Sequence, residues 1–187
     1  RIGERGTGEG QFNFPTHVAV DARGHLFVTD SMNFRVQELD EHFTFVRALG
    51  GLGDGPGDLP RSKGLAVDAH GTLWVVEGAF DVVQGFDAKG ELVAVFGGRG
   101  TDDGHLWLPA GLAIGADGKL YVAVGDNANS ATAQDLNNPF GKMLRFNDDG
   151  SIPSDNPFCT TANTLRCSIW ARGLRNPFTF AVRPSDG

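Results

Sequence analysis

The residues whose chemistry stands out lie near the C-terminal end of the chain. Between residues 155 and 186 the sequence has four arginines and no carboxylate. These arginines are Arg166, Arg172, Arg175 and Arg183. Guanidinium groups without competing acids are suited to holding an anionic ligand. A solvated basic face with distant partners is an equally good interpretation of the same pattern.

Other residues that could do chemistry carry weaker signals. Cys159 and Cys167 are eight positions apart in a segment rich in Thr, Asn and Pro, with no nearby histidine. This spacing favours a small disulfide loop over free thiols and makes a zinc site a poor interpretation. Ser151 and Ser168 lack the sequence context of an activated hydroxyl, so we assign no catalytic triad.

The elements that must position these residues belong to a repeat. Residues 18–28, 65–75 and 112–122 share one order of apolar residues around a turn, and equivalent positions are 47 residues apart. Each unit joins two apolar strands through a hairpin in which glycine supplies a positive φ. A period of about 40 to 50 residues with several strands is typical of propeller blades, whose sheets bury their faces against their neighbours.

The rest of each repeat supplies two more strands. We expect third strands at residues 36–40, 83–87 and 144–147, and fourth strands at 44–49 and 92–96. The loop between the second and third strands covers residues 30–35 in the first repeat but 125–141 in the third. Long polar loops on a rigid propeller are where binding residues usually lie, although loops also tolerate insertions well.

The long loop of the third repeat offers a further alternative. Its Asp, Asn and Ser oxygens could hold calcium in a lactonase-like propeller. The ligand pattern Asp-x-Asp-x-Asp-Gly is absent, and Asp and Asn in long loops more often form turns. We therefore assign no metal ligands.

The predicted fold is an all-β propeller of four-stranded antiparallel blades. The chain supplies three blades and, at residues 178–182, the first strand of a fourth, followed by a turn that ends at Gly187. Closed propellers have four to eight blades, so an incomplete ring would leave open sheet edges that invite pairing. We expect a piece of a longer protein, with self-association through the open edges as the alternative. The start at Arg1, without Met or a signal sequence, favours a processed or excised chain.

Composition and charge exclude some partners. The 187 residues are 40% hydrophobic and 21% charged, which suits a folded core. No stretch approaches the roughly 18 apolar residues of a membrane span. The net charge is −7, and residues 1–104 hold 16 Asp and Glu against 9 Lys and Arg. This balance argues against nucleic acid and favours a small ligand or a protein partner.

Residues 1 to about 123 resemble NHL-repeat propellers. The resemblance rests on the segments Gly-Glu-Gly-Gln-Phe-Asn-Phe-Pro at 8–15, Val-Thr-Asp-Ser-Met-Asn-Phe-Arg-Val-Gln at 28–37 and Leu-Pro-Ala-Gly-Leu-Ala-Ile at 108–114. In that family such segments chiefly build the blade, and the ring faces bind proteins, RNA or small ligands. For His17, Asp30 and Arg35 we expect turn and strand hydrogen bonding.

From about residue 116 the chain resembles the glucose/sorbosone dehydrogenase family. The matching segments are Asp-Gly-Lys-Leu-Tyr-Val-Ala-Val-Gly-Asp-Asn at 117–127, Gly-Lys-Met-Leu-Arg-Phe-Asn-Asp-Asp-Gly at 141–150 and Ala-Arg-Gly-Leu-Arg-Asn-Pro-Phe at 171–178. Family members are six-bladed propellers that oxidise aldose sugars with pyrroloquinoline quinone (PQQ) and calcium. The single propeller unit, residues 1–187, then consists of NHL-like blades at 1–115 and a dehydrogenase-like blade at 116–187.

The second resemblance implies roles for individual residues. Arg175 and Asn176 match the cofactor-contacting pair and would hold the quinone, whose carboxylates suit a guanidinium beside an amide. Asp126 matches the carboxylate that orients the catalytic histidine and raises its basicity. The position of that histidine holds Trp107, which cannot accept a proton. His105, the remaining candidate base, is two residues away, which is about 6 to 7 Å along a strand.

Two functions follow from the sequence. The first is a fragment or member of a PQQ-dependent sugar dehydrogenase, not catalytically complete in this chain. The alternative is a non-enzymatic NHL-repeat propeller that binds a ligand or a protein. A disulfide between the two cysteines favours an extracytoplasmic location, either periplasmic or secreted.

Overall fold

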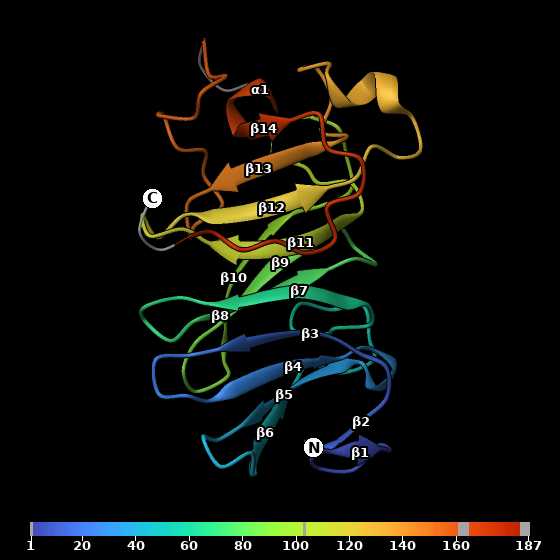
Figure 1. Cartoon of the computed structure of the whole chain (residues 1–187), viewed down its shortest axis with the longest axis vertical. Helices are drawn as coiled ribbons and strands as arrows, with labels where there is room; N and C mark the ends of the chain where they lie inside the picture. The colour runs from blue at the N-terminus through green and yellow to red at the C-terminus, as the bar shows by residue number, and fades with distance from the viewer. Residues whose placement is uncertain (1, 103, 161–164, 184–187) are drawn as a thin grey trace.

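The fold consists of three four-stranded antiparallel sheets (Figure 1). This computed structural model describes residues 2–102, 104–160 and 165–183. The first blade contains β3 (Pro15–Val20), β4 (Leu26–Asp30), β5 (Arg35–Leu39) and β6 (Phe45–Leu49). The second contains β7 (Ser62–Val67), β8 (Leu73–Glu77), β9 (Val82–Phe86) and β10 (Leu92–Gly97). The third contains β11 (Pro109–Ile114), β12 (Leu120–Val124), β13 (Lys142–Phe146) and β14 (Ile169–Arg172). The predicted all-β blades are confirmed.

The remaining elements are short. A two-stranded parallel sheet joins β1 (Glu4–Arg5) to β2 (Gln11–Phe12). The helical elements are η1 (Ser31–Asn33), η2 (Ser130–Ala133) and α1 (Leu165–Ser168). No helix in the described ranges is long and apolar enough to cross a membrane.

Side-chain acceptors close the hairpin between the first two strands of each blade. Asp21 Oδ1 accepts hydrogen bonds of 2.8 and 3.0 Å from two backbone N–H groups of its own turn, and Gly24 takes φ 84°. Asp68 does the same in the second blade. In the third blade Gly115 stands at the equivalent position, and Asp117 accepts one such bond instead. The hairpin is thus kept although the residue that closes it changes.

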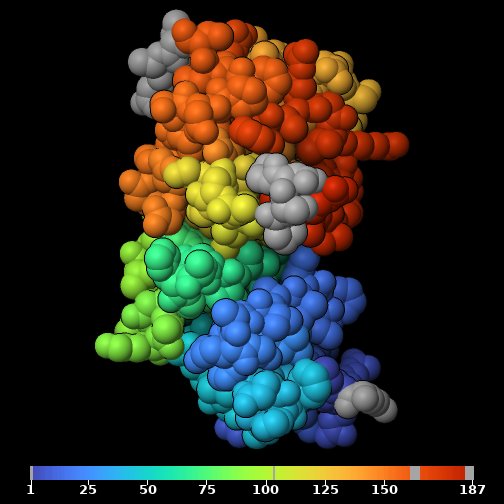
Figure 2. All heavy atoms as spheres, turned by 60° about the vertical axis from the view of Figure 1, so that its left-hand side comes forward, coloured from blue at the N-terminus to red at the C-terminus, as the bar shows by residue number. Residues whose placement is uncertain are grey.

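Apolar layers between the sheets join the blades. The first strands lie side by side, β3 against β7 and β7 against β11, and form the hub of the fan (Figure 1). Phe27 and Val36 of the first blade pack with Val75 and Phe86 of the second, and a similar cluster fills the next layer. Each fully buried side chain of this size stabilises the fold by about 1.5–3 kcal/mol. A single blade would lose much of this burial, and Figure 2 shows the blades layered along the long axis.

Buried polar residues attach the N-terminal segment to the first blade. Asp30 is fully buried and accepts hydrogen bonds from the backbone N–H of Asn13 at 2.6 Å, from Arg35 Nε at 2.9 Å and from Gln37 Nε2 at 3.0 Å. The backbone N–H of His17 donates to a neighbouring strand side chain at 2.7 Å. These contacts confirm the strand and turn hydrogen bonding expected for Asp30 and Arg35, whereas the His17 ring lies 3.4 Å from Phe178 O of the C-terminal segment.

The C-terminal segment differs from the expected start of a fourth blade. Residues 173–183 contain no strand, because first strands pair with the second strand of their own blade and the described residues include no such partner here. The segment crosses over β11 at the hub (Figure 1). A Cβ on Gly111 would lie 2.9 Å from Phe178 O, so glycine permits this approach. The turn expected at residues 184–187 lies outside the described residues.

One flank of the first blade is open. Ala19 packs into the layer toward the second blade, so its alternating neighbours Val18 and Val20 face the other way. They are 58% and 60% exposed. An apolar sheet face of this kind is suited to covering by another sheet.

Candidate functional site

A cavity of about 340 Å³ at the hub brings together three of the expected site residues. Asp126, Arg175 and Asn176 line it, together with Trp107 and Lys63. Its volume lies in the range of about 300–1,000 Å³ that is usual for small-molecule pockets. The lining comes from the second blade, the third blade and the C-terminal segment.

The end of β12 delivers Asp126 to the cavity. The backbone N–H of Asp126 donates to Arg175 O at 2.7 Å, and its buried carboxylate accepts from the N–H of Ala128 at 3.0 Å. Asn127 and Ala128 take φ 53° and 58°, in the left-handed region. Each such non-glycine residue costs about 1–2 kcal/mol. Local strain of this kind concentrates at binding and catalytic sites.

The cofactor pair predicted at Arg175 and Asn176 follows β14 and is held against the long loop. Leu174 N–H donates to Gly141 O at 3.0 Å, and Gly141 takes φ 65°. A Cβ on Gly141 would collide with Leu174 O, so this approach requires glycine. Within the part of the chain that the structure describes, the guanidinium of Arg175 has no partner, and the residue is exposed. Arg175 is therefore available to a ligand.

The other three arginines of the carboxylate-free stretch do not line this cavity. Arg172 Nη1 donates to Gln134 O at 3.0 Å, and Arg166 Nη2 donates to Asn137 Oδ1 at 3.4 Å. Both bonds fasten the long loop. The candidate anion-binding segment is thus reduced to Arg175 at the hub.

His105 and Trp107 occupy different surroundings. The described residues 98–102 and 104–108 precede β11 and contain only an isolated bridge, so a spacing calculated along a strand does not apply to them. His105 packs close to Gly100 and is not among the residues that line the cavity. Trp107 lines the cavity, and its ring meets Phe140 edge-on with centroids 5.9 Å apart. The buried Nε1–H of Trp107 has no hydrogen-bond partner in the described residues.

Lys63 is a lining residue that was not among the expected site residues. It lies on β7 and is half-buried. Burial lowers the pKa of its ammonium, and the nearby Arg61 lowers that pKa further. The sequence does contain a signal, because Thr16 and Ala110, each 47 residues away in the repeat, are small and uncharged. A cation at the hub position of one blade alone breaks the repeat.

Lys142, also outside the expected set, fixes the loop behind the cavity. It is fully buried, and its Nζ donates to the carbonyl oxygens of Thr132 at 2.9 Å, Ala133 at 3.1 Å and Phe140. Burial lowers the pKa of Lys142 to about 8, although Asp135 acts against this shift. Nothing in the local pattern of residues 142–146 distinguishes this lysine from an exposed one.

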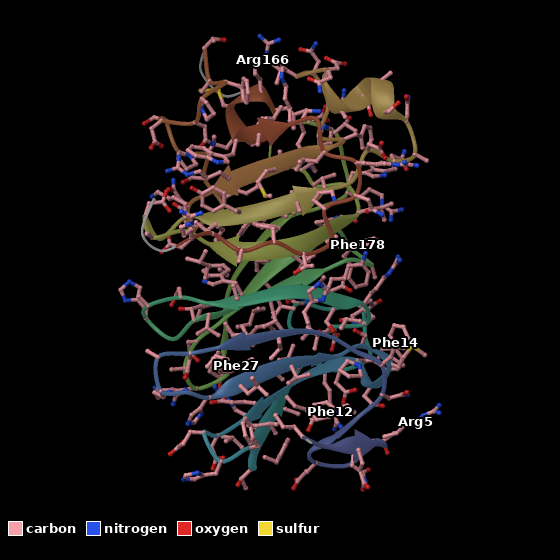
Figure 3. The ribbon with its side chains drawn as sticks, in the orientation of Figure 1. Arg5, Phe12, Phe14, Phe27, Arg166 and Phe178 are labelled. Atoms are coloured by element: carbon pink, nitrogen blue, oxygen red, sulfur yellow. A yellow bond between two sulfur atoms is a disulfide. The ribbon has the colours of Figure 1, made fainter. Side chains whose placement is uncertain are left out.

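The two cysteines form the predicted disulfide, Cys159–Cys167. The described residues hold no group of three or more His, Cys, Asp or Glu side chains placed to bind a metal ion. A second cavity of about 330 Å³ adjoins the first and shares Lys63, Ala110 and Phe178 with it. Figure 3 shows Phe178 and Phe14, which both line this second cavity, on the same side of the molecule.

Two protein-family models match separate parts of the chain. The model described as "Glucose / Sorbosone dehydrogenase" matches residues 94–187, and the model for the NHL repeat matches residues 12–39. Aldose sugar dehydrogenase YliI of Escherichia coli (strain K12) is 45% identical to the chain over 62 residues, which cover 33% of this chain and 16% of that protein.

Two solved structures share the fold. The PQQ-bound aldose sugar dehydrogenase from Streptomyces coelicolor has a TM-score of 0.64 at 24% identity, covering 94% of this chain and 55% of the other. A glucose dehydrogenase crystal structure has a TM-score of 0.61 at 20% identity, covering 97% of this chain and 57% of the other. The chain therefore spans little more than half the length of these structures.

Proposed function

Because the chain belongs to the glucose/sorbosone dehydrogenase family, we propose that it is part of a sugar dehydrogenase whose hub cavity binds PQQ. The single observation that carries this proposal is the convergence of Asp126, Arg175 and Asn176 on one cavity. These residues come from two segments that are about fifty positions apart in the sequence. Nothing in local chain geometry requires them to meet.

The donors around the cavity fit such a cofactor. The guanidinium of Arg175 has no partner in the described residues, and the same holds for the buried Nε1–H of Trp107. PQQ carries carboxylates, and these could accept hydrogen bonds from the guanidinium of Arg175. Calcium is a different case, because the described residues provide no cluster of ligands for it.

This chain's residues would bind and orient more than they would transfer protons. Arg175 would hold a carboxylate, and Asn176 would add an amide hydrogen bond beside it. PQQ, when bound, supplies the two-electron acceptor for oxidation of an aldose. Asp126 would orient a proton-accepting group next to it. Since Trp107 cannot accept a proton, we expect binding of the cofactor without appreciable sugar oxidation by this chain alone.

Titration with PQQ tests the proposal. We expect absorbance changes that report binding, and Arg175→Ala should raise Kd about 10- to 100-fold through loss of a charge-assisted contact. Arg5→Ala is the matched control, because it removes the same group from an exposed strand that does not line the cavity. Equal affinity of Arg175→Ala and the unaltered chain would refute the proposal. Dye reduction with glucose, in the presence of calcium, measures any turnover.

The binding-module alternative rests on Trp107, which lines the cavity and cannot accept a proton. It predicts that a ligand other than PQQ binds with Arg175-dependent affinity. A competition titration with PQQ separates the two functions, because only the dehydrogenase proposal requires PQQ to displace that ligand.

Location and assembly complete the proposal. The disulfide Cys159–Cys167 supports an extracytoplasmic location, since such bonds persist in oxidising compartments.

The exposed Val18 and Val20 support association through the open flank of the first blade. Light scattering at increasing concentration should detect that association, and Val18→Lys should abolish it.

A further inference from the structure

We propose that Lys63 is a second cationic contact for the ligand of the hub cavity, so that one polyanion is held between the NHL-like blades and the C-terminal segment. This inference rests on the proposed function for the identity of the ligand. The role of Lys63 itself rests on the cavity. Lys63 lies outside residues 94–187, which the dehydrogenase family model matches.

The ammonium of Lys63 is free to take a ligand. In the described ranges no carboxylate lies within 4.0 Å of it, although most buried or half-buried cations are paired. The stem of Lys63 packs against Gly78, where a Cβ would lie 3.0 Å from Lys63 Cε. This packing fixes the direction of the side chain. A half-buried cation with a supported stem is suited to a specific contact.

The surrounding charges leave the positive character of this side of the cavity intact. The buried carboxylate of Glu77 accepts backbone N–H bonds from Arg61 at 2.7 Å and Ala79 at 2.9 Å. The buried carboxylate of Asp81 is bonded to Arg99 Nε at 2.8 Å and to a backbone N–H. Both acids therefore have other partners, and their effect on Lys63 is limited to a longer-range attraction.

The ligand class follows from the positions of the donors. Lys63 comes from β7 and Arg175 from the segment after β14, and both line one cavity of about 340 Å³. A ligand with several carboxylates on a rigid frame can use both at once, and Trp107 and Phe178 add aromatic surface for a planar ring. The geometry thus selects a planar polycarboxylate.

The lowered pKa of Lys63 provides an independent readout. Burial disfavours the charged amine in the free protein, and a bound polyanion favours it, so binding should raise this pKa and take up protons in alkaline buffer. The groups that face Lys63 and share in this titration are Arg61, Glu77 and Asp81, with Asp126 and Arg175 in the same cavity.

The experiment measures Kd of the full chain for two probes, PQQ and benzene-1,3,5-tricarboxylate, which is planar and anionic but not a quinone. We expect Lys63→Met to raise Kd for both probes about tenfold, while Lys63→Arg stays within about threefold. Lys63→Met should also weaken the salt dependence of binding, because one ion contact is lost. Proton uptake, measured calorimetrically in buffers of different ionisation enthalpy, should fall in the same variant.

The matched control is Lys89→Met, which removes the same charge from an exposed turn of the same blade. We expect it to bind both probes like the unaltered chain. Thermal unfolding of the lysine variants checks that each is folded, and Lys63→Gln, which removes the charge but keeps a polar end, takes the place of Lys63→Met if the latter does not fold.

The outcomes separate the two proposals. If the unaltered chain binds PQQ and Lys63→Met binds it equally well, the role of Lys63 is refuted and the proposed function stands. If the chain binds the tricarboxylate through Lys63 but does not bind PQQ, the role of Lys63 stands and the proposed function fails. Absence of binding of both probes refutes both proposals.

Discussion

The first two blades and the third attach their loops to the sheet through different buried side chains. Gln37 Oε1 accepts from Gly10 N–H at 2.9 Å, and Gln84 Oε1 accepts from Gly57 N–H at 2.7 Å, each tying a preceding loop to the third strand. The register places Leu144 at the equivalent position of the third blade. There the buried ammonium of Lys142 donates to carbonyl oxygens of the loop instead.

The way in which the third blade holds its long loop places that loop beside the hub cavity. In the first two blades the glutamine amide both accepts from and donates to the preceding loop, since Gln37 Nε2 donates to Gln11 O at 2.6 Å and Gln84 Nε2 donates to Asp58 O at 2.8 Å. In the third blade one buried donor secures the loop from below and leaves its other side to line the cavity with Asp126, Asn127 and Ala128. The candidate site therefore lies where the repeat is broken.

Removal of the buried donor should have the largest effect. We expect Lys142→Met to lower the free energy of unfolding at pH 7 by about 3 kcal/mol, because three carbonyl groups lose their buried partner. Urea denaturation measures the change. Lys89→Met, at an exposed turn, should alter it by less than about 0.5 kcal/mol. Similar values for the two variants would remove the contrast between the blades.

Removal of an acceptor in the first blade should have a smaller effect. We expect Asp30→Asn to cost about 1–2 kcal/mol, since the amide presents N–H groups toward the donors of Asn13 and Arg35 but keeps the shape of the side chain. Binding at the hub should be unchanged, because Asp30 does not line that cavity. A loss of PQQ affinity in this variant would show that the two regions are coupled.

The smallest expected effect concerns pH. The pKa of Lys142, about 8 in the folded chain, lies below its ordinary value of 10.5, so between these values the unfolded chain binds more protons and stability rises with pH. From pH 7 to 8.5 the gain should be less than about 1 kcal/mol. Urea denaturation of the unaltered chain and of Lys142→Met over this pH range isolates the contribution of Lys142 to the free energy of unfolding. Parallel pH profiles would mean that the loop carbonyls keep the ammonium charged.

The parts of the fold that depend on local chemistry were predictable from the sequence. Asp21 with Gly24, and Asp68 in the next unit, define hairpins whose hydrogen bonds lie within five residues, and the strands follow from them. The prediction of a strand at residues 178–182 was wrong, because a strand needs a ladder partner that can lie far along the chain. An extended apolar pattern alone does not provide that partner.

The site was predictable only in part. Arg175, Asn176 and Asp126 stand in motifs, and the structure brings them to one cavity. Lys63 and Lys142 stand in no motif, and their surroundings come from segments many residues away. His105 is near Trp107 in sequence, but the irregular backbone between β10 and β11 separates their surroundings. Sequence proximity in a loop therefore gives no orientation.

The crossing of the C-terminal segment over β11 has a consequence for biosynthesis. The first two blades contact mainly their sequence neighbours and can fold while the nascent chain is still emerging from the ribosome. The hub cavity gains its arginine only when residue 175 has been translated and Gly141 has received the backbone of Leu174. Completion of the cavity is thereby postponed until residues 174 and 175 have docked on the third blade.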